Sequence, residues 1–448
     1  MQKEGPVKLR TSATRRALRL VTALAAVTVA AAACGTAANE NSDIGKSLQK
    51  VHITCGLSNG QKATGAPIKI GAIATESGGL DFSSAPDSAS AYFACVNANG
   101  GIHGRPIVYQ VQDDALNPQK ASALATKFAD DSSVVAMTGG ASFVACSVNQ
   151  PIYAKADLYD ILGVGVPKAC FYSKNMSPVN GGPHLSLISD AQELVNDFHV
   201  KTIAMTVYAI PGLGDWLAQG LQAWAKQAGV QVKWISQTTP PVADASTIIA
   251  KVKATHPDAY IPSLAAPDVA ALLKVAAQQN LGSSVHFGCL TPCYDTTFPG
   301  QIGSYWRGKF NSNSEFALVN STGPDNLNWR AILDKYGKPA YPRDSFSQAG
   351  YLAAKILVTT LLKLDPNNIT RATVSAAITQ IKDFKSDMFC TPWYFSGPNG
   401  HNNANHQLHN VKLDASGKYV QAAGCFETPD PALADILAAE KADPALVS

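Results

Sequence analysis

The stretch VNANGGIHGRPIVYQVQDD, residues 96–114, carries the signs that decide the fold. Its asparagines and the adjacent glycines Gly100 and Gly101 are typical of a helix end, because glycine readily adopts the left-handed conformation that stops a helix. RPIVYQVQ, residues 105–112, is rich in β-branched residues and predicts a strand. The stretch therefore predicts a helix, a tight turn and a strand that ends on a pair of aspartates.

Short apolar runs alternate with amphipathic segments along most of the chain, which is typical of parallel α/β structure. At 448 residues the chain is too long for one ordinary core, so we predict two α/β lobes, each with a parallel sheet. The predicted strands are 67–74, 105–112, 133–138 and 159–165, then 202–208, 230–236, 258–264 and 284–289. The main later helices are predicted at 245–255, 267–280, 325–336 and 344–364.

The N-terminal residues 1–33 have the pattern of an export signal: basic residues, then an apolar run, then small residues. The run is too short and too often interrupted by threonine to anchor the chain in a membrane. AAAC, which ends at Cys34, resembles the lipobox of bacterial lipoproteins and implies a lipid on Cys34. Plain cleavage after Ala33 is the alternative. Adjacent arginines in this segment leave general and twin-arginine export both open.

The charge distribution excludes a basic nucleic-acid-binding surface. Six of the 36 Lys and Arg residues and one of the 33 Asp and Glu residues lie in residues 1–33. The rest of the chain therefore has 30 basic and 32 acidic side chains, and no basic footprint for nucleic acid remains.

Eight cysteines remain if Cys34 carries lipid, and an even number in an exported protein favours disulfides. Eight cysteines allow about a hundred pairings, so the connectivity stays open. The pairs that we expect first are Cys289–Cys293, Cys390–Cys425 and Cys146–Cys170. A metal site is the alternative, but no CxxC pair or nearby histidine completes a zinc set.

Several blocks resemble, in order, the type I periplasmic solute-binding proteins, specifically the branched-chain amino-acid (Leu/Ile/Val) receptors of ABC importers. The blocks are IKIGAIATESGG, AYFACVNANGGIHGRPIVYQVQDDALNPQKASALATKFADDSSVVAMTGG, HPDAYIPSLAAPDVAALLKVAAQQNLG, KYGKPA and FSQAGYLAAKILVTTLLK. The resemblance covers about 67–420. It implies two Rossmann-like lobes joined by three crossovers, near 186–190, 310–316 and 386–392, with a ligand held between the lobes.

The resemblance sets the expected domain boundaries. They are 1–33 for the signal peptide, 34–66 for a lipid-anchored tether and N-terminal extension, 67–188 plus 314–388 for lobe 1, 189–313 plus 389–425 for lobe 2, and 426–448 for a C-terminal tail.

The resemblance also implies which loops line the ligand. The expected ligand-binding residues are Ser77, Ala141, Ser142, Phe143, Pro167, Lys168 and Ala169 in lobe 1, and Tyr208, Gly212, Ala265, Ala266, Tyr294 and Asp295 in lobe 2. Ala265 and Ala266 stand where the receptors have aromatics, and Cys293 lies nearest their ammonium-binding acid. These departures argue against leucine, isoleucine or valine, because a buried ammonium group without a partner is costly. Lys168 then favours an organic anion with an apolar or aromatic body.

Two other patterns suggest different chemistry. GLSNG, residues 56–60, fits the hydrolase pattern around Ser58, but neither a strand before it nor a helix after it is evident. His401, His406 and His409 lie close together in sequence, and we expect them to be polar residues of a surface hairpin rather than metal ligands.

We therefore expect an exported receptor, anchored through lipid to the outer face of the cell membrane, that passes a small amino-acid-like, organic-acid or aromatic solute to an ABC permease. It is expected to be a monomer without enzymatic activity, metal, cofactor or nucleic-acid partner. The alternatives are a ligand-sensing lipoprotein and a secreted serine hydrolase that uses Ser58.

Overall fold

The computed structural model describes residues 51–447, all within one unit of the chain, residues 44–448. The predicted signal peptide, Cys34 and the first part of the predicted tether lie outside the described residues. Among residues 51–447, no helix combines the length and the apolar character that crossing a membrane requires.

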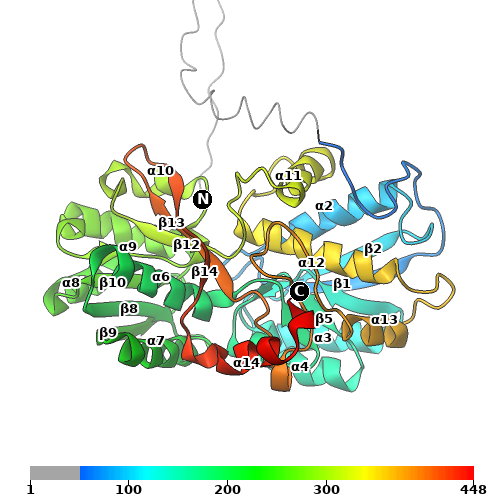
Figure 1. Cartoon of the computed structure of the whole chain (residues 1–448), viewed down its shortest axis with the longest axis horizontal. Coiled ribbons are helices and arrows are strands. Elements are labelled where there is room, and N and C mark those ends of the chain that lie inside the picture. Colours follow the sequence, from blue (N-terminus) through cyan, green and yellow to red (C-terminus); the bar gives the residue numbers. More distant parts are fainter. Residues whose placement is uncertain (1–50, 448) are drawn as a thin grey trace, which may run out of the picture. The chain divides into compact units, whose positions relative to one another are not determined.

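The first lobe is built on a parallel sheet in which β1 lies between β2 on one side and β3 and β4 on the other. Figure 1 labels β1, β2 and β5 of this sheet. β3 pairs with β5, and the short strand β4 pairs with β6. β7 pairs with β5 and forms the edge of the sheet opposite β2. The strands are β1 Ile68–Ala74, β2 Ile107–Asp113, β3 Val134–Thr138, β4 Ala141–Ser142, β5 Asp160–Leu162, β6 Val164–Gly165 and β7 Met176–Pro178. The helices of this lobe are α2 Ser84–Ala98, α3 Pro118–Asp130, α4 Ala145–Lys155, α5 Lys168–Phe171, α11 Pro324–Tyr336, α12 Ser345–Leu361 and α13 Arg371–Ile378.

The second lobe contains a four-stranded parallel sheet in the order β11-β10-β8-β9. Its strands are β8 Thr202–Tyr208, β9 Gln231–Thr238, β10 Ala259–Ser263 and β11 His286–Phe287, and its helices are α6 Gly182–Phe198, α7 Gly214–Ala228, α8 Ala245–Thr255, α9 Ala266–Gln278 and α10 Phe298–Ile302. With the first lobe, this arrangement confirms the predicted fold class of two α/β lobes with parallel sheets.

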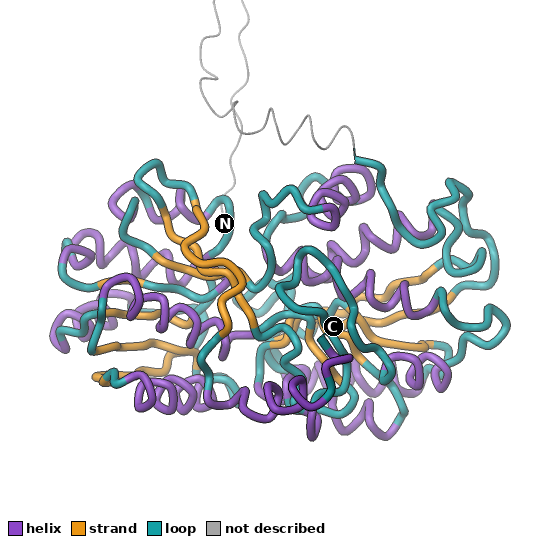
Figure 2. The backbone as a smooth tube through the Cα atoms, in the orientation of Figure 1, coloured by secondary structure: helices purple, strands orange, loops and turns teal. Residues whose placement is uncertain are grey.

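A third, antiparallel sheet lies beside the second lobe in the order β12-β13-β14 (Figure 2). Its strands are β12 Asn311–Ser314, β13 Gln407–Leu413 and β14 Tyr419–Glu427, and α14 Ala434–Ala442 follows. Short 3₁₀ helices complete the described part: η1 Leu281–Ser283, η2 Thr291–Cys293, η3 Ser304–Trp306, η4 Pro398–Gly400, η5 Pro431–Leu433 and η6 Pro444–Leu446.

The C-terminal end of α2 is connected to β2 by an asparagine side chain. The Asn97 side chain accepts a hydrogen bond from the backbone N–H of Ile107 (2.7 Å) and donates one to its carbonyl (2.8 Å), so α2 fixes the start of β2. Gly100 and Gly101 have φ values of 101° and 58°. A Cβ on Gly101 would lie 2.3 Å from the carbonyl oxygen of Arg105, so the turn requires glycine there.

The chain passes between the lobes at three places, which lie near one another around Glu315. The first follows β7 at Pro178, the second follows β12, and the third precedes β13. Because α6 packs against α7, β10 and β12, it belongs with the second sheet from its first residue, Gly182. The domain boundaries drawn from the sequence remain predictions.

Four disulfides join the eight cysteines of the described residues. They are Cys55–Cys95, Cys146–Cys170, Cys289–Cys293 and Cys390–Cys425, and they include the three pairs expected first from the sequence. Cys55–Cys95 attaches the segment before β1 to α2, and the carbonyl and N–H of Thr54 bond the Asn328 side chain of α11. Residues 51–66 therefore pack on the first lobe.

The C-terminal segment 430–447 is attached by three buried histidines. His184 Nδ1 lies 2.9 Å from Asp430 Oδ2, His401 Nδ1 lies 2.8 Å from Asp435 Oδ1, and His406 Nε2 lies 3.0 Å from Glu440 Oε2. The expectation that His401 and His406 are surface residues is wrong, since they are 3% and 1% exposed. The sequence could not reveal this, because the acids that cover them lie more than thirty residues further on.

Helices α2 and α12 cross closely because α12 has a glycine at the crossing. A Cβ on Gly350 would lie 1.8 Å from the backbone oxygen of Ala85, which cannot move without shifting α2. We expect Gly350→Ala to lower the free energy of unfolding by about 3 kcal/mol, as overpacked cores do. Urea denaturation measures this change. Gly300→Ala is the matched control, because a Cβ on this α10 glycine meets open space; equal effects of the two variants would contradict the explanation.

Candidate solute-binding site

An apolar cavity lies where the two lobes meet. The empty volume of the cavity is about 470 Å³, and the centre of a water molecule fits within about 50 Å³ of this volume. The first lobe contributes Phe82, Phe143, Val164, Val166 and Phe346, and the second contributes Tyr208, Leu213, Leu217, Leu264, Ala265 and Leu290. We call this space the inner cavity. Its lining by both lobes means that a bound molecule would touch both at once.

Aromatic rings form the wall of the inner cavity on the side of the first lobe and reach the second lobe. Phe82 packs edge-on against Phe143 (centroids 4.6 Å apart) and lies 5.0 Å from Phe346. Phe143 in turn lies 6.3 Å from Tyr208 of the other lobe. The Tyr208 hydroxyl donates to Asp268 Oδ2 (2.6 Å), so its ring is fixed in place. The wall therefore offers an apolar surface that is already ordered.

One carboxylate, Glu315, lines the inner cavity. It is 2% exposed and lies at the second crossover, directly after β12. Its Oε1 accepts hydrogen bonds from the N–H of Gly182 (2.6 Å), from Asn180 Nδ2 (3.1 Å) and from the Ser186 hydroxyl (3.4 Å). No described group donates to its Oε2. Burial raises the pKa of Glu315 to about 7, although these hydrogen bonds oppose the rise.

Glu315 also connects the three crossovers. Its side chain is held by residues of the first crossover, as described above. Its backbone carbonyl accepts from Asn405 Nδ2 (2.8 Å) of the third crossover, and the same amide donates to the carbonyl of Val179 (3.1 Å). A ligand that contacts Glu315 would therefore contact the residue that links all three segments passing between the lobes.

An outer cleft leads to the inner cavity. The outer cleft is wider, since the centre of a water molecule fits within about 420 Å³ of it. Phe82, Ala265, Pro292 and Phe346 line both spaces and form the neck between them. The outer cleft is acidic, with Glu76, Asp81, Asp295 and Asp344 in its lining and no lysine or arginine. Burial raises the pKa of Asp344 to about 6 and also raises that of Glu76.

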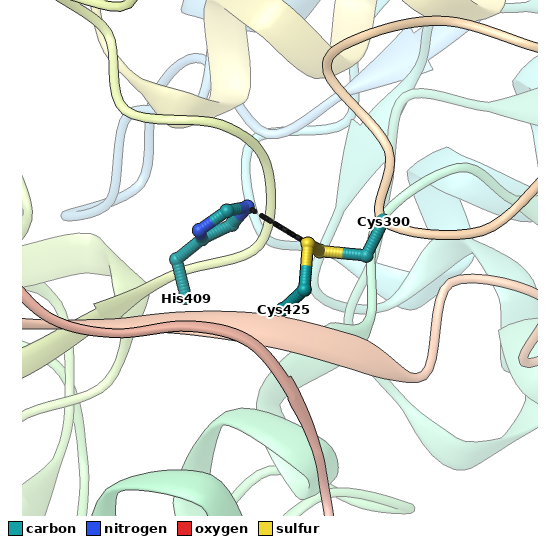
Figure 3. Close-up of side chains that lie close together, drawn as sticks. All are labelled: Cys390, His409 and Cys425. Carbon is teal, nitrogen blue, oxygen red and sulfur yellow. Dashed lines mark hydrogen bonds between the residues drawn. A yellow bond between two sulfur atoms is a disulfide. The ribbon is translucent and has the colours of Figure 1, made fainter.

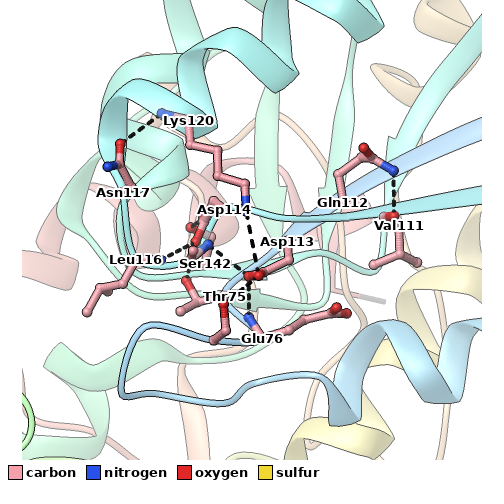
Figure 4. Close-up of polar contacts among 12 residues, drawn as sticks. Thr75, Glu76, Val111, Gln112, Asp113, Asp114, Leu116, Asn117, Lys120 and Ser142 are labelled. Atoms are coloured by element: carbon pink, nitrogen blue, oxygen red, sulfur yellow. Dashed lines mark hydrogen bonds and ion pairs between the residues drawn. The ribbon is translucent and has the colours of Figure 1, made fainter. Parts of the chain in front are cut away.

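The paired aspartates at the end of β2 hold the loops of the first lobe together (Figure 4). Asp114 is fully buried and accepts hydrogen bonds from the Thr75 hydroxyl (2.9 Å) and from the Ser142 hydroxyl. Asp113 accepts from the N–H of Glu76 (2.9 Å) and from the Ser77 hydroxyl (2.6 Å). Burial alone would raise the pKa of Asp113, but these hydrogen bonds lower it to about 2.

These bonds use the groups that would otherwise be available to a ligand carboxylate. The Ser142 hydroxyl, besides donating to Asp114, accepts from the N–H groups of Val144 (3.1 Å) and Ala145 (2.9 Å). The N–H of Phe143 bonds the Thr75 hydroxyl (3.3 Å). The loop after β3 therefore has its hydroxyl and its amides engaged within the lobe.

The lobes also meet through a backbone hydrogen bond. The N–H of Lys168, at the start of α5, donates to the carbonyl of Gly212 (2.9 Å) in the loop after β8. The ammonium group of Lys168 lies over the ring of Tyr172, 5.0 Å from its centroid, and lines neither the inner cavity nor the outer cleft.

The structure divides the residues expected from the sequence into three groups. The inner cavity is lined by Phe143, Tyr208 and Ala265; the outer cleft by Ser77, Ala265, Ala266 and Asp295. The remaining residues line neither space: Ala141, Ser142, Pro167, Lys168, Ala169, Gly212 and Tyr294. The buried Tyr294 hydroxyl accepts from the N–H of Val319 (3.1 Å).

Three main residues of the cavity lining are absent from the sequence-based expectations: Phe82, Phe346 and Glu315. Phe346 falls in the predicted helix 344–364, Glu315 falls in the predicted crossover 310–316, and Phe82 lies in a stretch to which no role was assigned. One feature of the sequence could have identified Glu315 as a binding residue. It is the single charged residue between Lys309 and Asp325, and it falls in a predicted crossover. An isolated acid at such a place favours a role in binding.

A possible metal-ligand cluster occurs in the described residues, where Cys390, His409 and Cys425 lie within 4.8 Å of one another (Figure 3). The two sulfurs form a disulfide, and His409 Nε2 lies 3.3 Å from Cys390 Sγ. Burial lowers the pKa of His409. A disulfide offers no thiolate, so in this oxidised form the cluster lacks the ligands that zinc prefers.

Ser58 does not have the surroundings of a hydrolase nucleophile. It lies in a turn with no strand before it and no helix after it among residues 51–66. Its hydroxyl accepts from the N–H of Cys55 (2.9 Å) and donates to the carbonyl of the same residue (3.2 Å). The strand–turn–helix arrangement of hydrolases is therefore missing.

Comparison with known proteins agrees with this geometry. The family model described as periplasmic binding protein matches residues 67–418, so the chain belongs to the periplasmic binding proteins, the type I substrate-binding proteins of ABC transporters. No curated protein sequence matches significantly.

Solved structures similar to this chain share its fold. A fatty acid ABC transporter substrate-binding protein from Thermomonospora curvata has a TM-score of 0.70 at 22% identity, covering 84% of this chain and 95% of its own. A possible leucine/isoleucine/valine-binding protein from Rhodopirellula baltica has a TM-score of 0.68 at 17% identity, covering 82% and 97%. A solute-binding protein from R. palustris in complex with 4-hydroxybenzoate has a TM-score of 0.67 at 17% identity, covering 82% and 99%.

Proposed function

We propose that this chain captures a small, largely apolar solute in the inner cavity and passes it to an ABC permease without catalysing a reaction. The observation that carries the proposal is the lining of one apolar cavity by both lobes. A molecule bound there contributes contacts to both lobes and so stabilises the state in which they touch. The solutes named for two similar structures, a fatty acid and 4-hydroxybenzoate, also have apolar bodies.

The chain is further proposed to be exported and anchored by a lipid on Cys34, as a monomer. The support is the export pattern of residues 1–33 and the AAAC sequence. A sensor that reports the same solute to a membrane partner would need the same cavity. A permease gene next to the gene for this chain would favour transport.

The proposal is tested by a thermal-shift screen combined with small-angle scattering. We expect a solute present at about 100 times its Kd to stabilise the protein by about 3 kcal/mol, because it binds only the folded form. The same solute should reduce the radius of gyration if the empty lobes stand apart. If no compound in a broad screen of amines, amides, acids and alcohols changes the melting temperature, the proposal fails.

A further inference from the structure

We infer that the solute is a small apolar amine without a carboxylate, whose ammonium group bonds the free Oε2 of Glu315. This inference rests on the proposed function and names the solute class for the same cavity. Glu315 is almost fully buried, and its Oε2 has no donor among the described residues. A buried acceptor without a partner is costly, and a ligand that supplies a donor removes that cost.

The charges around the entrance favour a cation over an anion. The outer cleft carries the carboxyl groups of Glu76, Asp81, Asp295 and Asp344, whereas no lysine or arginine lines either space. A cationic solute is therefore drawn toward the neck. An anion would cross this acidic entrance and then lack a counter-charge in the cavity.

The first lobe also gives reason to exclude amino acids. Free amino acids carry a carboxylate, which would need donors from the loop after β3. The hydroxyls of Thr75 and Ser142 donate instead to the buried Asp114. The N–H groups of residues 143–145 bond these same hydroxyls. A carboxylate here would meet a second carboxyl group and no free donor.

Ser263, at the end of β10, supplies a second polar contact in the same cavity. Its hydroxyl is buried and has no partner among the described residues. It is free to bond a polar group of the solute, and the apolar rest of the solute would pack against Phe82, Phe143 and Leu217.

Four compounds that share the same branched five-carbon chain test the inference by calorimetry and thermal shift: isopentylamine, isopentanol, isocaproate and leucine. Isopentylamine is leucine without its carboxylate, and isocaproate is leucine without its amine. We expect isopentylamine to bind most tightly, isopentanol less tightly, and isocaproate and leucine least tightly. Tighter binding of isocaproate or leucine would overturn the inference, while capture in the cavity would stand.

The variant Glu315→Gln removes the negative charge but keeps the size of the side chain, so it separates the effect of the charge from that of the cavity shape. The amide oxygen can still accept from Gly182 and Asn180, but the amide N–H₂ would face the ammonium group. We expect isopentylamine to bind about 30-fold more weakly or worse, the range of a lost charged hydrogen bond, with little change for isopentanol. Glu193→Gln is the matched control, because Glu193 is buried in α6 but does not line the cavity. Unchanged amine binding in Glu315→Gln would overturn the inference.

The pH dependence of the wild-type protein tests the inference without any variant. The groups that face the Glu315 carboxyl are Gly182, Asn180 and Ser186, none of which titrates. Because its pKa is raised to about 7, amine affinity should rise about tenfold per pH unit below pH 7 and level off above it. Isopentanol carries no charge, so its affinity should not change with pH unless the cavity itself changes shape. Asp344 of the outer cleft, whose pKa is raised to about 6, is tested separately with the variant Asp344→Asn, which should keep the pH profile of the amine. A flat profile for the amine would contradict the inference.

The outcomes for the inference and for the proposed function can be told apart. If no compound of the series binds and the wide screen also finds no ligand, both the inference and the proposed function are wrong. If only the series fails to bind, the inference alone is wrong.

Discussion

Removal of residues 430–448 is expected to cost most of the stability of the protein. The deletion takes away Leu433 and Ile436, which form a small buried cluster with Leu185 and Leu408. Each buried aliphatic side chain contributes about 2–5 kcal/mol, so these two alone approach the total stability of a typical domain. We therefore expect the truncated chain to be largely unfolded at 37 °C, as measured by circular dichroism and by proteolysis.

The deletion also removes the acids that contact His184, His401 and His406, so three polar contacts of the folded state are lost. Lys382→Ala is the control, because it removes only an exposed ion pair to Asp443 of the same segment. Its expected effect is below about 1 kcal/mol. A truncated chain that melts near the wild-type temperature would show that the C-terminal segment is not part of the stable fold.

Ala265→Phe is expected to weaken solute binding by about 100-fold or more. Ala265 forms part of the neck between the outer cleft and the inner cavity, and it is 7% exposed. A phenyl ring there would occupy the space that a solute needs, since the inner cavity has room for few atoms. A 100-fold change in Kd corresponds to about 3 kcal/mol of lost binding free energy. Calorimetry with the best solute from the thermal-shift screen measures the effect.

Ala266→Phe is the matched control for this variant. Ala266 lines only the outer cleft, so the same added ring one residue further on should leave the inner cavity open. We expect its Kd to stay within a few-fold of wild type. If both variants bind normally and fold normally, the solute does not occupy the inner cavity.

The parallel sheets were predictable because each strand has an apolar pattern of its own. The predicted helix 245–255 coincides with α8, and the predicted strand 67–74 differs from β1 by one residue. The third sheet was not predicted, because β12 reads Asn-Ser-Asn-Ser and all four residues are nevertheless buried. A polar strand gives no hydrophobic periodicity, and its burial is satisfied by contacts from other segments, such as that of Asn313 with the carbonyl of Ser186 (2.7 Å).

The candidate site was only partly predictable for a related reason. Phe143 directly follows β4 and Tyr208 is the last residue of β8, so an argument from strand ends finds both. Glu315 contacts Asn180, which lies 135 residues earlier in the sequence, and no local pattern reports such a contact. The sequence favoured an organic anion because of Lys168, but the direction of a loop lysine side chain depends on its folded neighbours, and here the ammonium group lies over Tyr172 and lines neither space.

The hydrogen bond from the Lys168 N–H to the Gly212 carbonyl has a consequence for how this receptor can diversify. Both atoms belong to the main chain, so the contact does not depend on the side chain at position 168, whereas position 212 requires glycine because its φ is 76°. Residues of the neck and of the aromatic wall can therefore change while this main-chain contact between the lobes is kept. A biosensor engineered from this scaffold would vary the cavity lining and retain Gly212.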